Sequence, residues 1–469
     1  MKRPHYVILG AGISGLALGW FLKQRHHAQI ELTILEASAR TGGWIQTEVK
    51  NDFLFEQGPR SFRPHGTGVS TLQLIESLGL QDEVIFADPA ARKRYLYIDQ
   101  RLQKLPSNPL SLLYSTFTPK LIYALWNDWR APKGILDDGN VDESIYLFAE
   151  RRFGKNFAEL FFDPLVSGIY AGNIKELSIK SCFPWLQLLE QNYRCIWRGA
   201  LCEKNKNKNN VDKPVLTPFV ESSCHKGIFT LKQGVQSLTD KLSAELNSHI
   251  RMNSCAKRLN FVEGVSVIEL QDGTKLTADR LFIAIPPKAL APLLSDYPEL
   301  TTKLKTISAS SLAVINFGYH SPVMKYSGFG HLIPSKEKQK LLGVVWDSSV
   351  FPQQNANRQQ TRLTAMIGGT HFPDFSSNSD STLIEMTLKE FREQLKISQV
   401  PDCIHIKRAH HAIPQYSVGH QARLFEIETE LKNKPAKIDL LGNGYYGISV
   451  NDCITQALQR TLPEKGHIS

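Results

Sequence analysis

The first 36 residues alternate between apolar runs and one glycine-rich turn. The apolar run YVIL at 6–9 leads into Gly10-Ala-Gly12-Ile-Ser-Gly15, a helical segment LALGWFLKQ follows, and a second apolar run ends at Glu36. Strand, turn, helix and strand in this order predict a βαβ unit. The three glycines permit a tight turn, a close approach of the backbone to a pyrophosphate, and close packing of helix on strand.

The same unit predicts a dinucleotide site. The phosphates would lie at the helix N-terminus, where free N–H groups and the helix dipole favour anions. Glu36 follows Gly15 by 36 − 15 = 21 residues, a spacing at which a carboxylate accepts hydrogen bonds from a ribose. An ordinary glycine turn is the alternative, and the register of both strands, the helix and the acid favours the dinucleotide.

A glycine doublet, Gly42-Gly43, follows the second strand where a nicotinamide-type fold would continue with a crossover helix. Its position favours FAD over NAD, because a flavin passes close to the backbone on its way to a second domain. A strand-like run from Phe53 then ends in a Gly-Pro turn flanked by Arg60 and Arg63. Ligand contact is the preferred interpretation of these arginines so near the glycine turn, and a solvated turn is the alternative.

Residues 109–133 are rich in leucine and aromatic residues. Pro119 interrupts this stretch, and Lys120, Arg130 and Lys133 flank it. The composition predicts an amphipathic helical hairpin in a membrane interface. A helical domain that packs on its own core is the alternative, and both hold if one helix face stays uncovered. The apolar positions at roughly helical spacing are Leu112, Leu113, Phe117, Leu121, Ile122, Leu125, Trp126 and Trp129.

Downstream patterns divide the rest of the chain. A second helical stretch ends at Gly172, and the polar run EKNKNKNNVDK at 203–213 is predicted to be a loop at a domain boundary. Strand-like runs dominate 291–407, with one helix, DSTLIEMTLKEFREQL, at 380–395. These runs predict an α+β domain on an antiparallel sheet.

The C-terminal stretch IDLLGNGYYGISVNDCITQALQRTL repeats the style of the opening. It predicts a strand, a turn at Gly442, Gly444 and Gly447, and a helix starting near Val450. A helix N-terminus aimed at the ligand would stabilise negative charge on a reduced flavin at its N1 and O2 edge. A plain terminal strand and helix is the alternative.

Together the patterns predict an α/β fold combined with an α+β part. A Rossmann-like FAD-binding domain comes from 1–92, 214–290 and 408–469. A helical membrane-binding insert occupies 93–213, and an antiparallel-sheet substrate domain occupies 291–407.

Charge and composition narrow the function classes. The 469 residues carry a net charge of +10, but the basic residues are dispersed, so no nucleic-acid partner is expected. An anionic membrane surface or a carboxylate-bearing substrate explains the excess at least as well. The seven cysteines are odd in number and never spaced CxxC, which indicates a reducing compartment without a disulfide framework or zinc site.

Targeting and catalytic motifs are missing from the sequence. No apolar run reaches the roughly 18 residues of a transmembrane helix, and a first strand at Tyr6 leaves no room for a signal peptide. GxSxG, HExxH and P-loop motifs are absent. His410-His411 is expected on a strand rather than at a metal. A flavin oxidase tolerates the absence of a catalytic acid, base or nucleophile, because its cofactor accepts the hydride and oxygen then reoxidises the cofactor.

Five segments resemble the protoporphyrinogen oxidase family, in the same order and through nearly the whole chain. The resemblance is stronger to the animal and plant mitochondrial type than to the Gram-positive type that acts on coproporphyrinogen. The segments are GPRSFRP at 58–64, SGIYAGNIKELSIKSCFP at 167–184, SGFGHLIPS at 327–335, IPQYSVGH at 413–420 and YGISVNDCI at 446–454.

This resemblance implies O2-dependent oxidation of protoporphyrinogen IX to protoporphyrin IX in haem biosynthesis. Six hydrogens leave the substrate, hydride passes to FAD N5, and O2 becomes H2O2. Tautomerisation brings each methylene bridge to the same position, which explains the missing general base. The alternatives are a coproporphyrinogen III oxidase, a flavin amine oxidase, and a non-catalytic lipid binder like the GDP-dissociation inhibitors.

The resemblance also implies partners and a location. It predicts monotopic attachment to a lipid surface, a homodimer, and handover of the product to ferrochelatase. We expect the cytoplasmic face of a bacterial plasma membrane, with the mitochondrial inner membrane as the alternative.

By motif, Arg94 resembles the family arginine that pairs with a substrate propionate, which a planar guanidinium binds bidentately. Gly168 resembles the glycine whose carbonyl faces the pyrrole nitrogens, and Ser167 stands where animal members often carry a basic residue. The apolar walls of the macrocycle site are carried over to Phe329, Leu332, Val345 and Met366. The FAD residues carried over are Gly10, Gly12, Ser14, Gly15, Glu36, Ala37, Gly43, Trp44, Gly58, Pro59, Arg60, Ser61, Ala256, Ile448, Ser449 and Val450.

Overall fold

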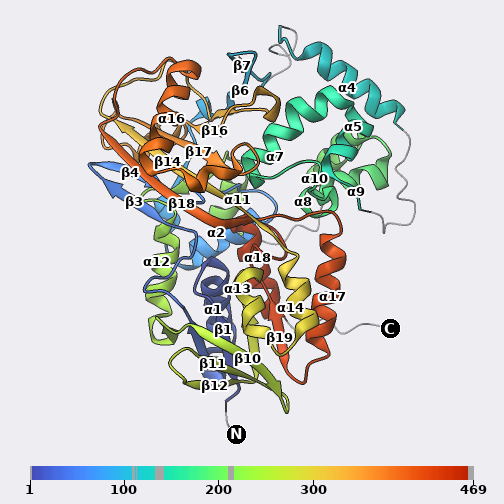
Figure 1. Ribbon diagram of the computed structural model, residues 1–469, viewed down its shortest axis with the longest axis vertical. Helices are drawn as coiled ribbons and strands as arrows, with labels where there is room; N and C mark the ends of the chain where they lie inside the picture. The colour runs from blue at the N-terminus through green and yellow to red at the C-terminus, as the bar shows by residue number, and fades with distance from the viewer. Residues whose placement is uncertain (1–2, 108–110, 112–113, 132–141, 210–215, 463–469) are drawn as a thin grey trace.

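A computed structural model describes residues 3–107, 111, 114–131, 142–209 and 216–462 (Figure 1). The half that contains both termini of the described chain lies at the bottom of the view. The upper half holds a large sheet on the left and a group of helices on the right.

A five-stranded parallel sheet forms the lower half, in the order β19-β13-β1-β2-β9. Its strands come from three distant stretches of the chain, as the discontinuous first domain requires. Successive β1 side chains point to opposite faces, so Ile8 joins one hydrophobic core while Val7 and Leu9 join the other. The strands are β1 (His5–Leu9), β2 (Glu31–Leu35), β9 (Ile250–Arg251), β13 (Arg280–Ile283) and β19 (Lys437–Leu440).

Helices cover one face of this sheet, and a small sheet with further helices covers the other. The first face packs against α1 (Ile13–His26), α2 (Gly68–Ser77), α11 (Pro218–Cys224), α12 (Gln236–Glu245) and α18 (Val450–Thr461). The second packs against β10 (Ala256–Val262), β11 (Val265–Leu270), β12 (Lys275–Ala278), α13 (Pro287–Leu290), α14 (Pro298–Lys305) and α17 (His420–Lys432).

A seven-stranded sheet forms the upper left half, in the order β18-β14-β17-β16-β15-β6-β7. Its neighbours are antiparallel except for β15 and β6, which are parallel. The helix α16 (Asp380–Gln394), where the sequence predicts one, packs on this sheet in a shared core. The strands are β6 (Arg94–Ile98), β7 (Arg101–Lys104), β14 (Ala309–Tyr319), β15 (Gly330–Leu332), β16 (Leu341–Val345), β17 (Thr361–Gly368) and β18 (Cys403–Pro414).

Two predicted domain limits differ from this sheet. The limit at residue 93 assigns the β6–β7 hairpin to the helical insert, whereas β6 pairs with β15. The limit at residue 407 divides β18, which continues to Pro414. Pairing between strands more than 200 residues apart has no local sequence pattern, so the hairpin is assigned to a sheet only by tertiary contacts.

The helical insert has its own core at the upper right of Figure 1. Pro119 lies in the first turn of α4, a position that needs no N–H donor, so it starts the helix rather than breaking one. Leu112, Leu113 and Lys133 of the predicted hairpin lie outside the described residues. The principal helices are α4 (Thr118–Arg130), α5 (Ile145–Phe153), α7 (Asp163–Tyr170), α9 (Pro184–Tyr193) and α10 (Ile196–Asn209).

The predicted loop at 203–213 is wrong for its first part. The helix α10 runs through residue 209, because lysine tolerates a helix well and Ile196 in the first turn of α10 packs in the core of the insert. Within the described residues, no helix combines the length and hydropathy that crossing a bilayer requires.

Shorter strands and helices connect these parts of the fold. They include β3 (Thr47–Lys50), β4 (Phe53–Glu56), β5 (Val84–Phe86), β8 (Phe229–Leu231), α8 (Ile179–Cys182) and α15 (Asp347–Val350).

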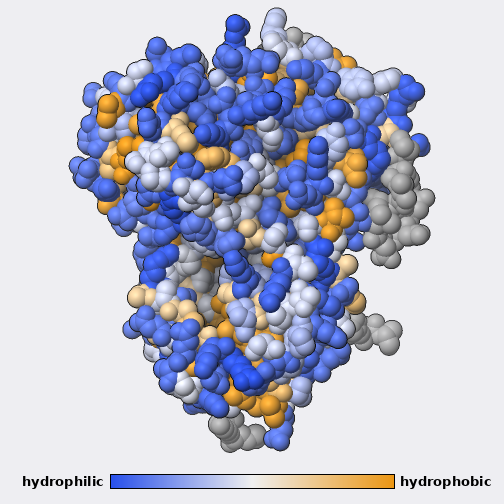
Figure 2. All heavy atoms as spheres, in the orientation of Figure 1, coloured by the Kyte–Doolittle hydropathy of each residue, from blue (hydrophilic) through white to orange (hydrophobic). Residues whose placement is uncertain are grey.

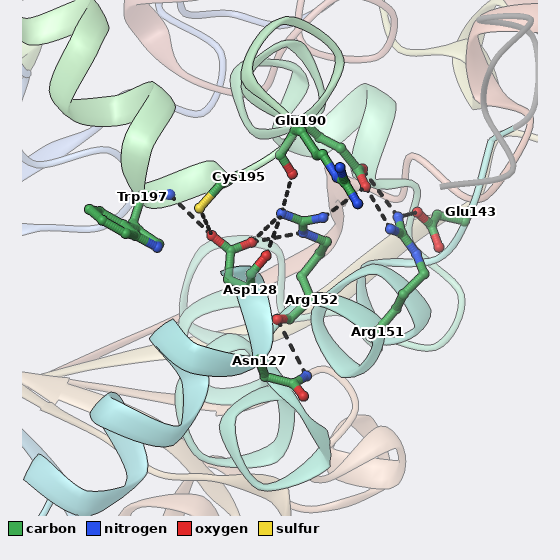
Figure 3. A network of polar contacts seen from close by, with 9 residues as sticks. Asn127, Asp128, Glu143, Arg151, Arg152, Glu190, Cys195 and Trp197 are labelled. Atoms are coloured by element: carbon green, nitrogen blue, oxygen red, sulfur yellow. Dashed lines mark hydrogen bonds and ion pairs between the residues drawn. The ribbon is translucent and has the colours of Figure 1, made fainter. Parts of the chain in front are cut away.

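A buried ionic network joins the helices of the insert (Figure 3). Arg152 of α5 is fully buried, and its Nε donates to Oδ1 of Asp128 on α4 at 2.8 Å. Another guanidinium nitrogen of Arg152 lies 3.5 Å from Glu190 of α9. The second carboxylate oxygen of Asp128 accepts the Cys195 thiol and the Trp197 N–H, each at 3.2 Å. The network therefore ties α4 to α5, α9 and the start of α10.

Candidate flavin and substrate site

The glycine turn between β1 and α1 leaves no room for side chains. A Cβ on Gly15 would lie 1.9 Å from the carbonyl oxygen of Gly10, and Gly10 has φ +99°. Gly12 is the N-cap residue of α1, and within the described residues no side chain caps this helix terminus. The first-turn N–H groups are therefore open to an anion, as a pyrophosphate requires.

Glu36 lies at the end of β2, against the glycine turn. Its Oε2 accepts the backbone N–H of Ala11 at 2.9 Å, and its Oε1 accepts the N–H of Ser38 at 2.9 Å. The Ser38 hydroxyl also donates to Oε1 at 2.8 Å. These bonds fix the carboxylate beside the turn and leave Oε2 a further lone pair for a ribose hydroxyl. Ala37 follows on the exposed surface.

Ala256 reaches the same corner from another part of the chain. It begins β10, and the N–H of the nearby Ser254 donates to the carbonyl oxygen of Glu36 at 2.8 Å. The structure thus brings this strand, which sequence pattern alone aligned, next to the predicted ribose site.

The glycine doublet Gly42-Gly43 packs against the N-terminal glycine turn. The N–H of Gly42 donates to the carbonyl of Ala11 at 2.8 Å, and a Cβ on Gly43 would lie 3.2 Å from the Cα of Gly12. Trp44 is 38% exposed. A Cβ on Gly58 would lie 2.2 Å from the Trp44 carbonyl oxygen, so the segment from Gly58 through Pro59 to Ser61 starts beside the doublet.

The C-terminal glycine turn meets the N-terminal one. A Cβ on Gly442 would lie 3.4 Å from the Ser14 hydroxyl oxygen. Val450 begins α18, and Ser449 caps that helix through its hydroxyl in a capping box with Asp452. The Ser449 side chain is therefore engaged within the protein, and Ile448 before it is half-buried.

Arg60 connects this region with the large sheet. Its Nη1 lies 3.1 Å from Oδ1 of Asp347, at the start of α15. The other Asp347 oxygen accepts the hydroxyl of Thr364 on β17 at 2.7 Å. Asp347 escaped sequence reasoning because 287 residues separate it from Arg60, and no local pattern relates them.

The predicted propionate arginine lies where β6 meets β15. Arg94 pairs with Gly330, and its guanidinium carbon lies 5.7 Å from the centre of the Phe329 ring. Partial desolvation, followed by the positive charge of Arg63, lowers the pKa of Arg94. Among the described residues no carboxylate pairs with Arg94, so the guanidinium is available to an anionic ligand.

Three of the four predicted apolar walls share one cluster beside Arg94, and Leu332 packs in a neighbouring cluster. Phe329 and Met366 pack against a buried cluster that includes Val345. A Cβ on Gly168 of α7 would lie 2.6 Å from a methyl carbon of Leu332, so α7 and the Leu332 side chain pack in close contact at this glycine. Leu332, Val345 and Met366 thus come from β15, β16 and β17, Gly168 comes from α7, and Phe329 directly precedes β15.

Ser167 has a different surrounding from its neighbour. It is 1% exposed, and its hydroxyl donates to the carbonyl of Pro164 in the same helix at 3.2 Å. The serine therefore satisfies itself within α7. Within the described residues, no group of three or more histidine, cysteine or acidic side chains could hold a metal ion.

The N-terminal glycine turn follows the carboxyl end of β1, and the C-terminal glycine turn follows the carboxyl end of β19. The large sheet adjoins them through the ion pair of Arg60 and Asp347. This arrangement defines a two-part, dinucleotide-binding protein. Room for backbone alone at Gly15, Gly43 and Gly58 fits an extended FAD.

Comparisons with known proteins resolve the class further. The sequence pattern of the flavin-containing amine oxidoreductases matches residues 13–454. Protoporphyrinogen oxidase of Bos taurus is 35% identical over 470 residues, covering 97% of this chain and 96% of the relative. The Homo sapiens enzyme is 33% identical and covers 98% of both chains. The chain therefore belongs to the flavin-containing amine oxidoreductase family, and within it to the FAD-dependent protoporphyrinogen oxidases.

Other relatives mark the limits of this similarity. Coproporphyrinogen III oxidase of Bacillus subtilis (strain 168) is 28% identical, covering 97% of this chain and 96% of the relative. A candidate protoporphyrinogen oxidase structure from Exiguobacterium sp. 255-15 has a TM-score of 0.81 at 22% identity, with 98% of both chains covered. The structure of reduced UDP-galactopyranose mutase has a TM-score of 0.71 at 15% identity, with 98% of this chain and 93% of the mutase chain covered. These two structures share the fold.

Proposed function

We propose that this protein oxidises protoporphyrinogen IX to protoporphyrin IX with O2, as a step of haem biosynthesis. The observation that carries the proposal is the near full-length similarity to enzymes of that name, at 33–35% identity. The Arg94 and Phe329 pair, with the apolar walls around it, supports a substrate that is mostly apolar and bears carboxylates.

The chain's own groups bind and orient such a substrate. The Arg94 guanidinium receives one propionate through parallel hydrogen bonds, and Phe329, Leu332, Val345 and Met366 contact the macrocycle and exclude water. The Gly168 carbonyl accepts the pyrrole N–H groups. The glycine turns at Gly10–Gly15 and Gly442–Gly447 would hold FAD, which would supply the hydride acceptor for a methylene bridge, with O2 as the final oxidant reduced to H2O2.

The competing function is oxidation of coproporphyrinogen III, which carries four carboxylates. Initial rates on both porphyrinogens, read as porphyrin fluorescence with peroxide counted and an enzyme-free blank subtracted, separate the two. We expect the two-carboxylate substrate to react faster, with three peroxides per porphyrin. A clear preference for the four-carboxylate substrate would overturn the proposal.

Replacing Arg94 tests the substrate site separately from the flavin site. Loss of a charged hydrogen bond costs about 1.5–3 kcal/mol, so Arg94→Ala should raise KM about 10- to 150-fold with the yellow flavin spectrum intact. Arg92→Ala changes an exposed arginine two residues away and should leave KM near the wild-type value. Loss of flavin in Arg94→Ala would show that Arg94 belongs to the cofactor site instead.

We further propose that the helical insert binds a lipid surface from one side. On α4, Ile122, Leu125, Trp126 and Trp129 are 47–67% exposed, and Figure 2 shows hydrophobic residues among the hydrophilic surface of the insert. Leu121 instead packs inward against the cluster of Phe117, so it is not a lipid contact. Exposed apolar residues on the neighbouring helices are Trp185 and Leu188 of α9 and Trp197 and Leu201 of α10.

Vesicle partitioning tests this surface. The triple replacement of Leu125, Trp126 and Trp129 by serine should reduce cosedimentation with anionic phospholipid vesicles at least tenfold, because about 1.5–3 kcal/mol is lost per buried apolar side chain. Phe425→Ser, at a 71% exposed position of α17, is the matched control. Equal partitioning of the triple variant and the wild type would refute the lipid surface.

Three related predictions rest on the resemblance. They are a homodimer, handover of the porphyrin to ferrochelatase, and attachment to the cytoplasmic face of a bacterial plasma membrane or to the mitochondrial inner membrane. The FAD contacts at the predicted cofactor residues belong to the same proposal, and flavin content after single replacements tests each of them.

A further inference from the structure

The C-terminal glycine turn is held by two side chains of the IPQYSVGH segment. The Tyr416 hydroxyl donates to the carbonyl of Asn443 at 2.5 Å and accepts the N–H of Gly447 at 2.8 Å. His420 Nε2 lies 2.9 Å from the carbonyl of Tyr445. Three backbone groups of one turn therefore depend on two side chains about 30 residues earlier in the chain.

These two side chains form one rigid unit. Their rings stack with centres 4.2 Å apart, and each residue is 1% exposed. Because a carbonyl only accepts, His420 Nε2 carries the proton, and its Nδ1 has no partner within the described residues. Burial raises the pKa of Tyr416 and lowers that of His420 to about 4, so both groups are neutral near pH 7.

The same segment is fixed on its other side by the helical insert. Gln415 donates to the carbonyl of Tyr170, two residues after Gly168 on α7, at 2.8 Å. The N–H of Ser178 donates to the carbonyl of Tyr416 at 2.8 Å. Segment 415–420 thus lies between the substrate-facing helix and the C-terminal turn, and it cannot shift without straining one of them.

We propose that Tyr416 and His420 are positioning residues for the flavin. They hold the turn from Gly442 to Gly447 in the one geometry in which its backbone dipoles and the N-terminus of α18 stabilise negative charge on the reduced cofactor. Dipoles that are fixed in advance need no reorganisation when charge develops, and this makes them effective. The inference rests on flavin binding and does not depend on which porphyrinogen is oxidised.

The midpoint potential of the bound flavin, measured without substrate, tests the proposal. Tyr416→Phe keeps the stacked ring but removes the hydroxyl that serves Asn443 and Gly447. We expect FAD to remain bound and the oxidised form to be favoured at least tenfold more, a fall of about 30 mV for a two-electron couple. In turnover, kcat should fall while KM stays near the wild-type value.

Two further variants separate positioning from general stability. Tyr446→Phe removes a hydroxyl of the same turn that bonds Glu428 instead, and its potential should match the wild type. His420→Leu should lower the potential, whereas His420→Gln keeps an N–H donor for Tyr445 and should restore it. These two replacements test the proposal even if Tyr416→Phe folds poorly.

Certain outcomes would overturn the inference. Folded, flavin-loaded Tyr416→Phe and His420→Leu proteins with wild-type potentials would show that both residues only support the fold. An equal shift in Tyr446→Phe would show that any loss in this turn has the same effect. Failure on protoporphyrinogen with the expected potentials would instead count against the proposed function alone.

Discussion

The flavin turns and the helical insert are organised by opposite means. At the flavin turns the backbone itself forms the site, and an added Cβ at Gly15 or Gly58 would overlap a carbonyl oxygen. In the insert, charged side chains from distant segments meet in the interior, with Arg152 and Asp128 both fully buried (Figure 3). The flavin turns depend on glycines that leave the backbone free of side chains, and the helical insert depends on buried charged side chains that all have their partners.

This difference explains how each region responds to change. A backbone site fails when anything is added, because no rotamer relieves contact with a carbonyl. A buried ionic network fails when anything is removed, because the remaining charge keeps its desolvation cost without its partner. Three replacements test this contrast.

Gly15→Ala should have the largest effect. Its Cβ would lie 1.9 Å from the Gly10 carbonyl oxygen, so the turn must open, and we expect the protein to be purified without flavin. Gly227→Ala is the matched control, because no atom lies within 4 Å of its added Cβ. Flavin content by absorbance is the measurement, and a normally yellow Gly15→Ala protein would contradict the backbone site.

Arg152→Met should destabilise the insert by about 3–5 kcal/mol, because Asp128 loses its buried cation. Urea unfolding of the flavin-loaded protein, with hydrogen exchange of α4, measures the loss. Lys155→Met breaks an exposed pair with Glu159 and should cost below about 1 kcal/mol. Adding Asp128→Leu to Arg152→Met should recover part of the stability, and no recovery would mean that packing rather than charge is lost.

Glu56 sharpens the contrast, because neutral groups alone hydrogen-bond this buried carboxyl group. It accepts the Val235 N–H at 2.7 Å and the Thr47 hydroxyl at 2.9 Å. Burial raises its pKa to about 7. The folded state therefore holds the proton more tightly than the unfolded chain does. The resulting stability is complete below the unfolded pKa of about 4.5 and is lost as the pH rises through about 7.

Replacement of Glu56 should remove this pH dependence. Across that range the wild type should lose up to about 3 kcal/mol relative to Glu56→Gln. Urea unfolding of both proteins at a series of pH values measures the difference. Parallel stability curves between pH 4.5 and 8 would show that the carboxyl ionises as readily in the folded protein as in the unfolded chain.

Sequence reasoning succeeded where the cause is local. The turn at Gly10, Gly12 and Gly15 and the acid Glu36 follow from spacing within one βαβ unit, and the family comparison confirms the flavin class. The helix starting at Val450 is likewise confirmed. The individual site residues stay predictions, although the structure gathers them around two adjoining sheets.

Contacts between residues that are distant in the chain could not be predicted from the sequence. Nothing local relates Arg60 to Asp347 or Asp128 to Arg152, and helical spacing alone could not show that Leu121 faces inward. The helix over 203–209 has no apolar periodicity of its own, and its polar composition is typical of a loop, so only the structure shows it. Tyr416 lies in a segment that carried the resemblance, but its contacts with the C-terminal turn required the fold.

The position of β19 and α18 has a consequence for synthesis in the cell. The edge strand at 437–440 pairs with β13, and α18 packs in the same core as α1. A nascent chain therefore cannot bring its two glycine turns together until β19 and α18 have been synthesised. We therefore expect chains truncated before Lys437 to be purified without flavin.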